Sequence, residues 1–373
     1  MYYILAIILA AALYYWQVSY YEKHWYRNLD ANISFNKTHV NIGDTVQLTE
    51  EVRNAKRMPL PVLYVKFRTS KSFHFEDNDN VFISDHYHRN DIFSILGNQQ
   101  ITRNLQFRTT KRGYFETTYI NLVANDLFMK HSYAIKLHNH ASLYVYPALL
   151  TDKSSLYQTS AIMGDLQKRD LFEDPLSFRG IREYTTRDNM RYINWKSSAK
   201  NQELMVNTYF SNQTTKVLIL FNLDTNIMQR DTKLQEYMIR IVTTLLHNLN
   251  KNGLATRLAI NIEDPWNEQL ISTDLGQGHE HLQNMLQLLA RLDLSKKLFP
   301  FTDFFTGPCS LFESKCNQTT YLIVSNYRKE MLLKEYTEKI NAGHRIQFIC
   351  PETRQLWTPT PGITLWEVNT HEI

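Results

Sequence analysis

The start of the chain differs from everything that follows, because an uncharged run extends from Tyr2 to Tyr21. Roughly 20 helical residues, each rising 1.5 Å, cover the roughly 30 Å hydrocarbon core of a bilayer. Tyrosine and tryptophan gather toward the ends of the run, as they do in the aromatic belts of membrane helices. We therefore predict a transmembrane helix over residues 1–22.

A cleavable signal peptide is the alternative interpretation of this run. Signal peptides carry a basic region before a shorter apolar stretch, whereas no basic residue precedes Ile4. The nearest charges, Glu22, Lys23 and Arg27, all follow the run, and an excess of Lys and Arg marks the cytoplasmic side. We expect an uncleaved, single-pass anchor in the cell membrane, with the soluble domains in the cytoplasm.

Short β-prone runs follow one another at hairpin-like intervals over residues 30–148. Apolar and polar side chains alternate, as in Leu63–Arg68, which is typical of strands with one buried face. Gly43 and Gly113 stand at turn positions between such runs. The pattern predicts an antiparallel β-sandwich of immunoglobulin-like architecture.

Strands alternate with amphipathic helices over residues 214–373. Lys216–Phe221 is a continuous apolar strand, and Asp231–Asn252 places apolar residues at helical spacing before Gly253. This alternation predicts a largely parallel sheet with helices on both faces. The expected fold class is therefore multidomain α+β, with residues 149–213 as a linker segment between the β-sandwich and an α/β domain.

Composition excludes several functional classes. The 373 residues are 43% hydrophobic, which is enough for sizeable cores and excludes a disordered chain. Lys and Arg number 41 against 37 Asp and Glu, a small excess without the dense basic stripe of a nucleic-acid binder. The three cysteines, Cys309, Cys316 and Cys350, form no C-x-x-C pair and are interpreted as reduced core thiols.

The linker segment interleaves charged and aromatic side chains. Five charges (Arg182, Glu183, Arg187, Asp188, Arg191) and three aromatics (Tyr184, Tyr192, Trp195) fall within fourteen residues. We interpret this set first as an interdomain clasp of ion pairs and hydrogen bonds. A surface that docks a protein partner is the second interpretation, since Arg and Trp are favoured in interface hot spots. A phosphate or substrate site is the third.

The clasp interpretation carries an energetic expectation. If the Trp195 indole is buried in a clasp, its removal costs roughly 3–5 kcal/mol. Removal of Arg191 costs a comparable amount if it leaves the Glu183 or Asp188 carboxylate buried and unpaired.

The same segment resembles the signature of the bacterial family called domain of unknown function 58. The resemblance rests on Arg182-Glu183-Tyr184, Asp188, Arg191, Ile193, Trp195-Lys196 and Ser198-Ala199-Lys200. It extends upstream to Arg112-Gly113-Tyr114, Asn125-Asp126-Leu127-Phe128 and Tyr146-Pro147. The usual Gly-Asp of the signature is Arg187-Asp188 here, which indicates a divergent member.

The resemblance implies that residues 214–373 form a von Willebrand factor A-like domain. In such domains the first strand ends in Asp-x-Ser-x-Ser and binds Mg²⁺. Here the corresponding residues are Asn222, Asp224 and Asn226, and a later strand ends in Ser325-Asn326. Two carboxylate positions have become amides, so we predict no competent metal site and no cofactor. The alternative role for Asp224 or Asn226 is to cap the next helix.

Two histidine pairs, His86/His88 and His138/His140, suit zinc chelation only with a third ligand, and the sequence identifies none. We interpret these histidines as exposed residues of sheet edges or loops. No Ser/His/Asp order, G-x-S-x-G elbow or phosphate-binding glycine loop is present, so the sequence predicts a protein that is not an enzyme.

The expected function is a membrane-anchored scaffold or adaptor. The family resemblance implies a partner, a MoxR-type AAA ATPase, with which the protein assembles or matures client proteins that the sequence does not identify. The alternative is an extracellular, metal-dependent adhesion module of von Willebrand factor A type, which needs an intact ion site. A third hypothesis, an envelope hydrolase, needs a nucleophile and a base that the sequence does not provide.

Overall fold

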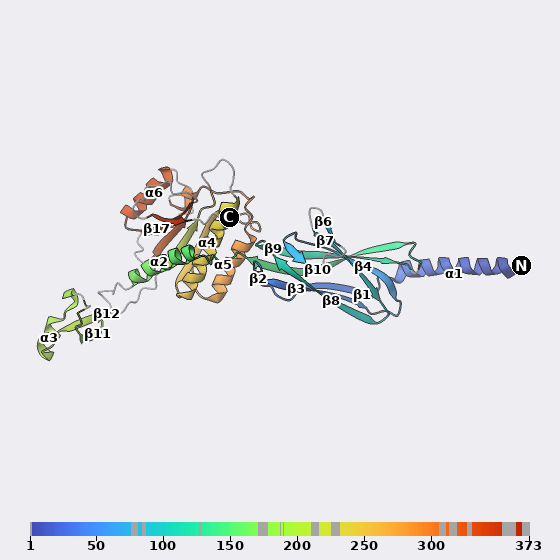
Figure 1. The fold of residues 1–373 in the computed structure, drawn as a ribbon, viewed down its shortest axis with the longest axis horizontal. Helices are drawn as coiled ribbons and strands as arrows, with labels where there is room; N and C mark the ends of the chain where they lie inside the picture. The colour runs from blue at the N-terminus through green and yellow to red at the C-terminus, as the bar shows by residue number, and fades with distance from the viewer. Residues whose placement is uncertain are drawn as a thin grey trace. The chain divides into compact units, whose positions relative to one another are not determined.

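The computed structural model describes residues 2–75, 81–83, 87–126, 128–170, 178–186, 188, 190–209, 216–224, 232–305, 311–312, 319–326, 330–352 and 363–367. Within them the chain is a mixed α+β protein that begins with an apolar helix and contains several sheets (Figure 1). It divides into two compact units, Met1–Ala148 and Leu149–Ile373. Each unit is described by itself below.

The first unit begins with helix α1 (Tyr2–His24). Among the described residues, it is the one helix that is long and apolar enough to cross a membrane. Its first twelve residues, 2–13, are exposed, whereas Tyr21 and the following Trp25 are buried against the β-rich part of the unit. The last turns of the helix are therefore packed against the β-rich part of the same unit.

Two sheets follow α1 and enclose one core. The first sheet has the strand order β1-β3-β8-β5, with β1 (Leu29–Phe35), β3 (Thr45–Asn54), β8 (Gln99–Thr109) and β5 (Phe73–Phe75). The second has the order β2-β10-β9-β4-β7-β6, with β2 (His39–Asn41), β10 (Ser132–Tyr146), β9 (Gly113–Asn125), β4 (Leu60–Thr69), β7 (Tyr87–Ile95) and β6 (Val81–Ile83). All pairs are antiparallel except β2 with β10.

Alternation along the strands decides which side chains enter this core. In β3 every second residue is buried, among them Val46, Leu48 and Val52, while the residues between them are more exposed. In β4 of the other sheet, Leu63, Val65 and Phe67 do the same, and both sets belong to one apolar cluster. The two sheets are thus packed face to face, as the alternating pattern predicted; the immunoglobulin-like topology stays a prediction.

The second unit is built on a six-stranded sheet of order β15-β14-β13-β16-β17-β18. Its strands are β13 (Lys216–Phe221), β14 (Ala255–Glu263), β15 (Leu270–Ser272), β16 (Thr319–Val324), β17 (Arg345–Glu352) and β18 (Ile363–Glu367). All of its pairings are parallel except the one between β14 and the edge strand β15.

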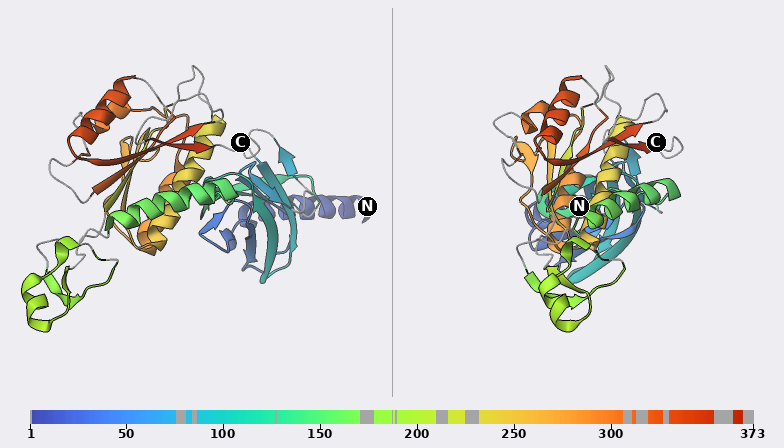
Figure 2. Two further views of the ribbon diagram at one scale, coloured as in Figure 1. Left: turned by 60° about the vertical axis from the view of Figure 1, so that its left-hand side comes forward. Right: turned by 90° about the vertical axis from the view of Figure 1, so that its left-hand side faces the viewer.

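Helices cover both faces of this sheet (Figure 2). They are α2 (Lys153–Asp170), α4 (Thr232–Lys251), α5 (His279–Arg291) and α6 (Glu330–Asn341), with a short 3₁₀ turn η2 (Phe301–Phe304). Leu218 and Leu220 of β13 pack with α6 and η2 residues, while the alternate residues of β13 are also buried. Burial on both faces explains why β13 is a continuous apolar run rather than an alternating one.

A small element group interrupts the second unit between α2 and β13. We call it the signature module, residues 178–209. It consists of β11 (Phe178–Glu183), the 3₁₀ turn η1 (Met190–Tyr192), helix α3 (Trp195–Asn201) and β12 (Met205–Tyr209), with β11 antiparallel to β12.

Candidate functional site

The charged residues of the signature module are partly joined by a local ion pair. Arg182 donates from Nη1 to Asp188 Oδ2 at 2.7 Å and from Nη2 to Oδ1 at 2.6 Å. The N–H and the hydroxyl of Thr185 each donate to Asp188 Oδ2 at 2.8 Å. The Arg182 bonds first, and then those from Thr185, hold the pKa of Asp188 well below its usual range. This network fixes the turn after β11.

A second set of bonds fixes α3 against β12. Asn194 caps α3, because its Oδ1 accepts the N–H of Ser197 at 3.0 Å. The Ser198 hydroxyl donates to the Asn194 carbonyl at 2.8 Å and accepts the Met205 N–H at 2.9 Å. Gln202 ends the helix in the left-handed conformation, with φ of 56°. Ser198 therefore acts as a structural link, and the sequence analysis missed its partner Asn194.

The remaining predicted residues of the module face outward. Trp195 is 70% exposed, so its indole is not buried within the module, and the interdomain clasp stays a prediction. Glu183, Arg191, Lys196 and Lys200 are also exposed, and Tyr184 is half-buried.

Exposed apolar side chains surround Trp195 in the sequence of the module. We call this set the apolar patch: Phe178, Ile181, Met190, Trp195 and Leu204, each at least 40% exposed. Val206 is the one apolar side chain of the module that is fully buried among the described residues. A two-stranded sheet with so small a core is marginally stable in water by itself.

One of the predicted ion-site positions, Asn222, belongs to a buried network of neutral side chains. Asn222, at the end of β13, donates from Nδ2 to Ser325 Oγ at 3.0 Å. Its Oδ1 accepts Nδ2 of Asn261 at 2.7 Å and the N–H of Asp224 at 3.0 Å. Asn261 Oδ1 accepts the N–H of Leu223 at 2.8 Å. Asn222, Asn261 and Ser325 are all fully buried.

These donors do not fit a divalent cation. Both lone pairs of the Asn222 side-chain oxygen are engaged by N–H donors, so that oxygen has none left for an ion. Asp224 is half-buried, Asn326 lies beside Cys350 with Sγ and Oδ1 3.9 Å apart, and Asn226 lies outside the described residues. Within the described part of the chain, no three His, Cys, Asp or Glu side chains gather in a way that suits a metal.

Among the described residues, which leave out 225–231, Asp224 does not cap helix α4. Helix α4 begins at Thr232, too far along the chain for Asp224 to be its N-cap. The buried amides instead bridge the ends of β13, β14 and β16, a role that the sequence analysis did not assign to Asn261. In the sequence, an Asn within or directly after an apolar strand run was the signal that could have indicated this role.

The predicted histidine pairs lie in the first unit. His138 packs against Tyr119, with ring centroids 5.1 Å apart, and His140 is exposed beside Glu116. His88 lies on β7, while His86 lies outside the described residues, as do Cys309 and Cys316. Cys350 is a buried free thiol.

An ionic cluster inside the sandwich was missed entirely by the sequence analysis. Arg89 and Asp91, both on β7 and both 2% exposed, are joined by Nε–Oδ2 at 2.9 Å and Nη2–Oδ1 at 3.2 Å. Arg103 of β8 donates to Asp91 Oδ1 at 3.1 Å. Glu50 of β3, 1% exposed, is the cross-strand partner of Arg103. We call these four residues the core ionic cluster.

One carboxyl of this cluster is held neutral. Burial, and next the negative charge of Asp91, raise the pKa of Glu50 to about 9. The arginine charges oppose this shift but do not cancel it. At neutral pH the Glu50 side chain is therefore a carboxylic acid that lies beside the Arg89–Asp91 pair.

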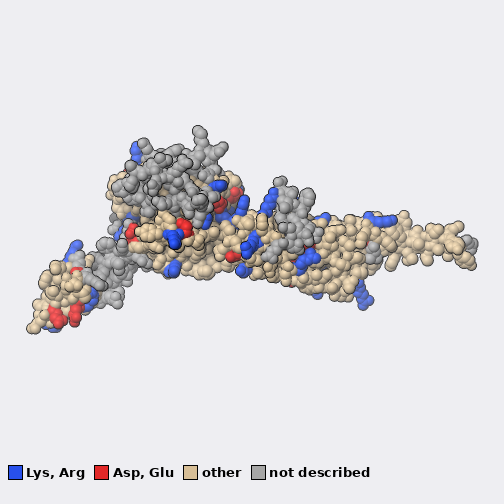
Figure 3. Space-filling view, viewed as in Figure 1, with Lys and Arg blue, Asp and Glu red and all other residues tan. Residues whose placement is uncertain are grey.

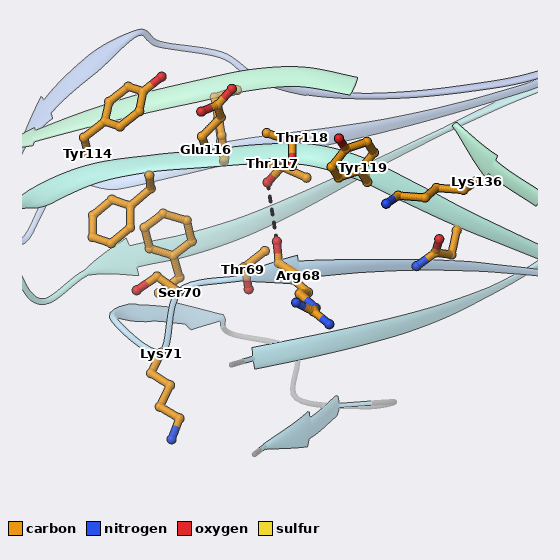
Figure 4. Close-up of a pocket in the computed structure, with 14 residues that line it drawn as sticks. Arg68, Thr69, Ser70, Lys71, Tyr114, Glu116, Thr117, Thr118, Tyr119 and Lys136 are labelled. Carbon is orange, nitrogen blue, oxygen red and sulfur yellow. Dashed lines mark hydrogen bonds between the residues drawn. The ribbon is translucent and has the colours of Figure 1, made fainter. Parts of the chain in front are cut away.

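A groove of about 740 Å³ opens where two strands of the sandwich separate (Figure 4). The β4–β9 ladder runs from Leu63↔Ala124 to Phe67↔Ile120, and the groove lies beyond its end. Basic and aromatic side chains line it, among them Arg68, Lys71, Lys136, Tyr114 and Tyr119, with Glu116 as its one acidic residue. This lining suits an extended polypeptide segment that carries acidic side chains.

Comparison with known proteins identifies part of the chain. Residues 180–343 match the model of the family described as protein of unknown function DUF58. The match includes the signature module and most of the α/β sheet, and it confirms the family resemblance predicted from the sequence. No curated protein matches the chain.

Several solved structures match parts of the chain at low identity and low TM-score. The CARDB domain of a Pyrococcus furiosus protein, solved with two metal ions, is 13% identical, with 32% of this chain and 96% of that chain covered and a TM-score of 0.21. A non-cellulosomal cohesin from Archaeoglobus fulgidus is 12% identical, with 34% and 96% covered and a TM-score of 0.22. The collagen-binding subdomain of the Enterococcus faecalis surface protein ACE is 10% identical, with 32% and 97% covered and a TM-score of 0.22.

Proposed function

We propose that this protein is a membrane-anchored, non-enzymatic adaptor whose signature module docks a MoxR-type AAA ATPase. The observation that carries the proposal is the apolar patch. The ion pair and the helix cap of the signature module are made between residues of the module itself, while the Trp195 indole is 70% exposed. Exposed tryptophan and methionine beside arginine are the side chains enriched at protein–protein interfaces.

The α/β sheet supports a scaffold rather than a metal-dependent role. Its strand order, with one antiparallel strand at the edge, agrees with a von Willebrand factor A-like domain. The residues at the ion-site end of that sheet bond to one another. We propose that this domain presents surfaces to partners and that the groove beside β4 and β9 receives an extended segment of a client protein.

The anchor places these surfaces at a membrane. Helix α1 has the length and composition to span a bilayer, and Lys23 and Arg27 follow it directly. The positive-inside rule therefore favours a cytoplasmic position for the folded domains. An AAA ATPase draws on cytoplasmic ATP, so this orientation agrees with the proposed partner.

Affinity capture from membranes tests the docking role. Full-length protein is captured with and without ATP, and the MoxR-type ATPase is identified by mass spectrometry. Trp195→Ala should lose the ATPase while its unfolding midpoint stays near that of the wild type. Trp266→Ala, which removes another exposed indole of the same unit, is the matched control and should retain capture. Equal capture by both variants would contradict the docking role of the patch.

The adhesion hypothesis is tested through its metal. A cation that binds only the native state raises the unfolding midpoint by mass action. We expect no shift with millimolar Mg²⁺, because the Asn222 oxygen is already saturated with donors. A saturable shift that disappears in Asp224→Ala would favour the adhesion module instead.

A further inference from the structure

The β9–β10 hairpin of the sandwich contacts the membrane helix along its side. The ring of Phe128 lies 5.6 Å from that of Tyr14, and Lys130 Nζ lies 5.5 Å from the Tyr14 ring centroid. The more buried positions of α1, Tyr14, Gln17, Val18, Tyr21 and Trp25 near its end, recur at helical spacing. The helix therefore turns one face toward the hairpin from Tyr14 onward.

The level of this contact along α1 is the central observation. The first charges after the apolar run are Glu22 and Lys23, which mark where the helix leaves the lipid. Tyr14 precedes Glu22 by a little over two helical turns, which at 1.5 Å per residue is about 12 Å. Along α1 the surface shows no charged side chain before this region (Figure 3). A hairpin tip that touches Tyr14 therefore lies beyond Glu22 and Lys23, on the side of the apolar run that would be in the lipid.

The tip, residues 128–131, has the chemistry of a lipid-contacting loop. Phe128 is 59% exposed and Met129 is 63% exposed, and Lys130 and His131 follow them. Amphipathic helices that combine apolar with basic side chains enter the headgroup region by roughly 5–10 Å, and the tip carries the same combination of side chains. Tyr14 lies about 12 Å from Glu22 along the helix, close to the deep end of that range.

The tip is held rigidly by the carboxylate of Asp126. Asp126 Oδ1 accepts the N–H of Lys130 at 2.8 Å, and Oδ2 lies 3.1 Å from Nδ1 of His131. Burial by itself raises the pKa of Asp126, but the bonds from His131 and Lys130 outweigh it and lower that pKa. Met129 has a φ of 56°, a left-handed conformation that a non-glycine residue adopts only under local constraint. The turn is thus formed before any lipid is present.

Basic side chains surround this end of the sandwich. Asn28, which follows Arg27, accepts the N–H of Ala55, and Asn98 donates to the Lys56 carbonyl, so these loops lie at the end where α1 enters. Exposed Arg27, Arg53 and Arg57 belong to this end, together with Lys23 of α1. Such a cluster suits the headgroups of anionic phospholipids.

We propose that the β9–β10 tip is a second membrane contact, in which Phe128 and Met129 insert into the headgroup–acyl boundary of an anionic bilayer beside α1. The proposal rests on the membrane anchor of the proposed function. It makes the first unit a body seated in the bilayer surface rather than one tethered at a distance from it. Partners would then meet the protein at a fixed height above the lipid.

Photocrosslinking in nanodiscs of phosphatidylcholine and phosphatidylglycerol tests this contact. A benzophenone side chain replaces Phe128, Leu9 of the exposed part of α1, or Lys111 in an exposed turn of the sandwich, each in the full-length protein. All three positions are exposed, so folding should persist. Phospholipid adducts are then measured by mass spectrometry of the intact protein.

We expect phospholipid adducts at positions 9 and 128 and none at position 111. Adducts at position 9 alone would overturn the proposal and leave the anchor intact. Absence of adducts at both 9 and 128 would overturn the anchor as well. Equal adducts at 128 and 111 would also overturn the proposal, because lipid contact would not be specific to the tip.

Discussion

Two Arg–Asp pairs in this protein are both joined by two hydrogen bonds, but one is buried and the other is exposed. Arg89 and Asp91 meet inside the sandwich, where both side chains are 2% exposed. Arg182 and Asp188 meet on the signature module, where they are 48% and 15% exposed. The exposed pair has the shorter bonds, 2.6 and 2.7 Å against 2.9 and 3.2 Å. Distance therefore does not indicate which pair matters more for stability.

Solvent decides the difference between the pairs. An exposed ion pair exchanges bonds to water for bonds to each other and contributes little to stability. A buried pair loses its hydration on folding, so the removal of one partner strands the other in an apolar core. The core ionic cluster is consequently expected to control the stability of the sandwich, whereas the surface pair sets the shape of a turn that presents the apolar patch.

Asp91→Ala should give the largest effect. The substitution removes the carboxylate that accepts bonds from Arg89 and Arg103, and we expect a loss of about 3–5 kcal/mol in unfolding free energy. Chemical denaturation measures it. Asp30→Ala, at an exposed position of β1, is the control and should change stability little. A loss under 1 kcal/mol for Asp91→Ala, about that of a surface pair, would break the comparison.

Glu50→Gln should give the next largest effect, and one that depends on pH. The folded-state pKa of about 9 lies above the ordinary value of 4.5, so between these values the folded protein retains a proton that the unfolded chain releases. Stability from this group is therefore full below pH 4.5 and falls as pH rises toward 9. Glutamine is neutral at every pH, so Glu50→Gln should remove this fall in stability with rising pH.

Thermal midpoints at mildly acidic and mildly alkaline pH measure the Glu50 effect. At alkaline pH, Glu50→Gln should be more stable than the wild type by about 1–3 kcal/mol, because no charge is then buried beside Asp91. Glu51→Gln, on the other face of β3, is the matched control and should leave the pH profile unchanged. Identical profiles for Glu50→Gln and the wild type would show that Glu50 is not held neutral.

Asp188→Asn should give the smallest effect on global stability. The pair with Arg182 is exposed, so the unfolding midpoint should stay within error of the wild-type value. The local effect should be visible, because the Thr185 N–H donates to Asp188 and its hydrogen exchange should become faster. Asp165→Asn on α2 serves as the control. A large fall in the unfolding midpoint would show that the exposed pair contributes as much to global stability as the buried pair, and would contradict the comparison.

Local patterns in the sequence predicted the elements well where neighbours along the chain decide the structure. The uncharged run at the start is helix α1, and the alternation of Leu63–Arg68 is strand β4. The continuous apolar run Lys216–Phe221 is β13, whose two faces are both buried. Periodicity reports one-dimensional spacing directly, and secondary structure converts that spacing into faces.

Those patterns did not predict which residues of distant strands become neighbours. Glu50 breaks the apolar alternation of β3, but nothing near it in the sequence identifies Asp91 of the other sheet as its neighbour. The Asn222 position was found, yet its bonds to Asn261 and Ser325 depend on the parallel register of three strands.

The sequence by itself determined an apolar first helix long enough to span a membrane, the order of β-rich and α/β regions, and the location of the family signature. Only the tertiary structure decided that Trp195 faces outward, that Glu50 keeps its proton, and that the hairpin tip reaches Tyr14. The physical reason is that burial and pKa depend on which surfaces meet in space. Spacing along a chain fixes which side chains share a face, while sheet register and packing fix what that face touches.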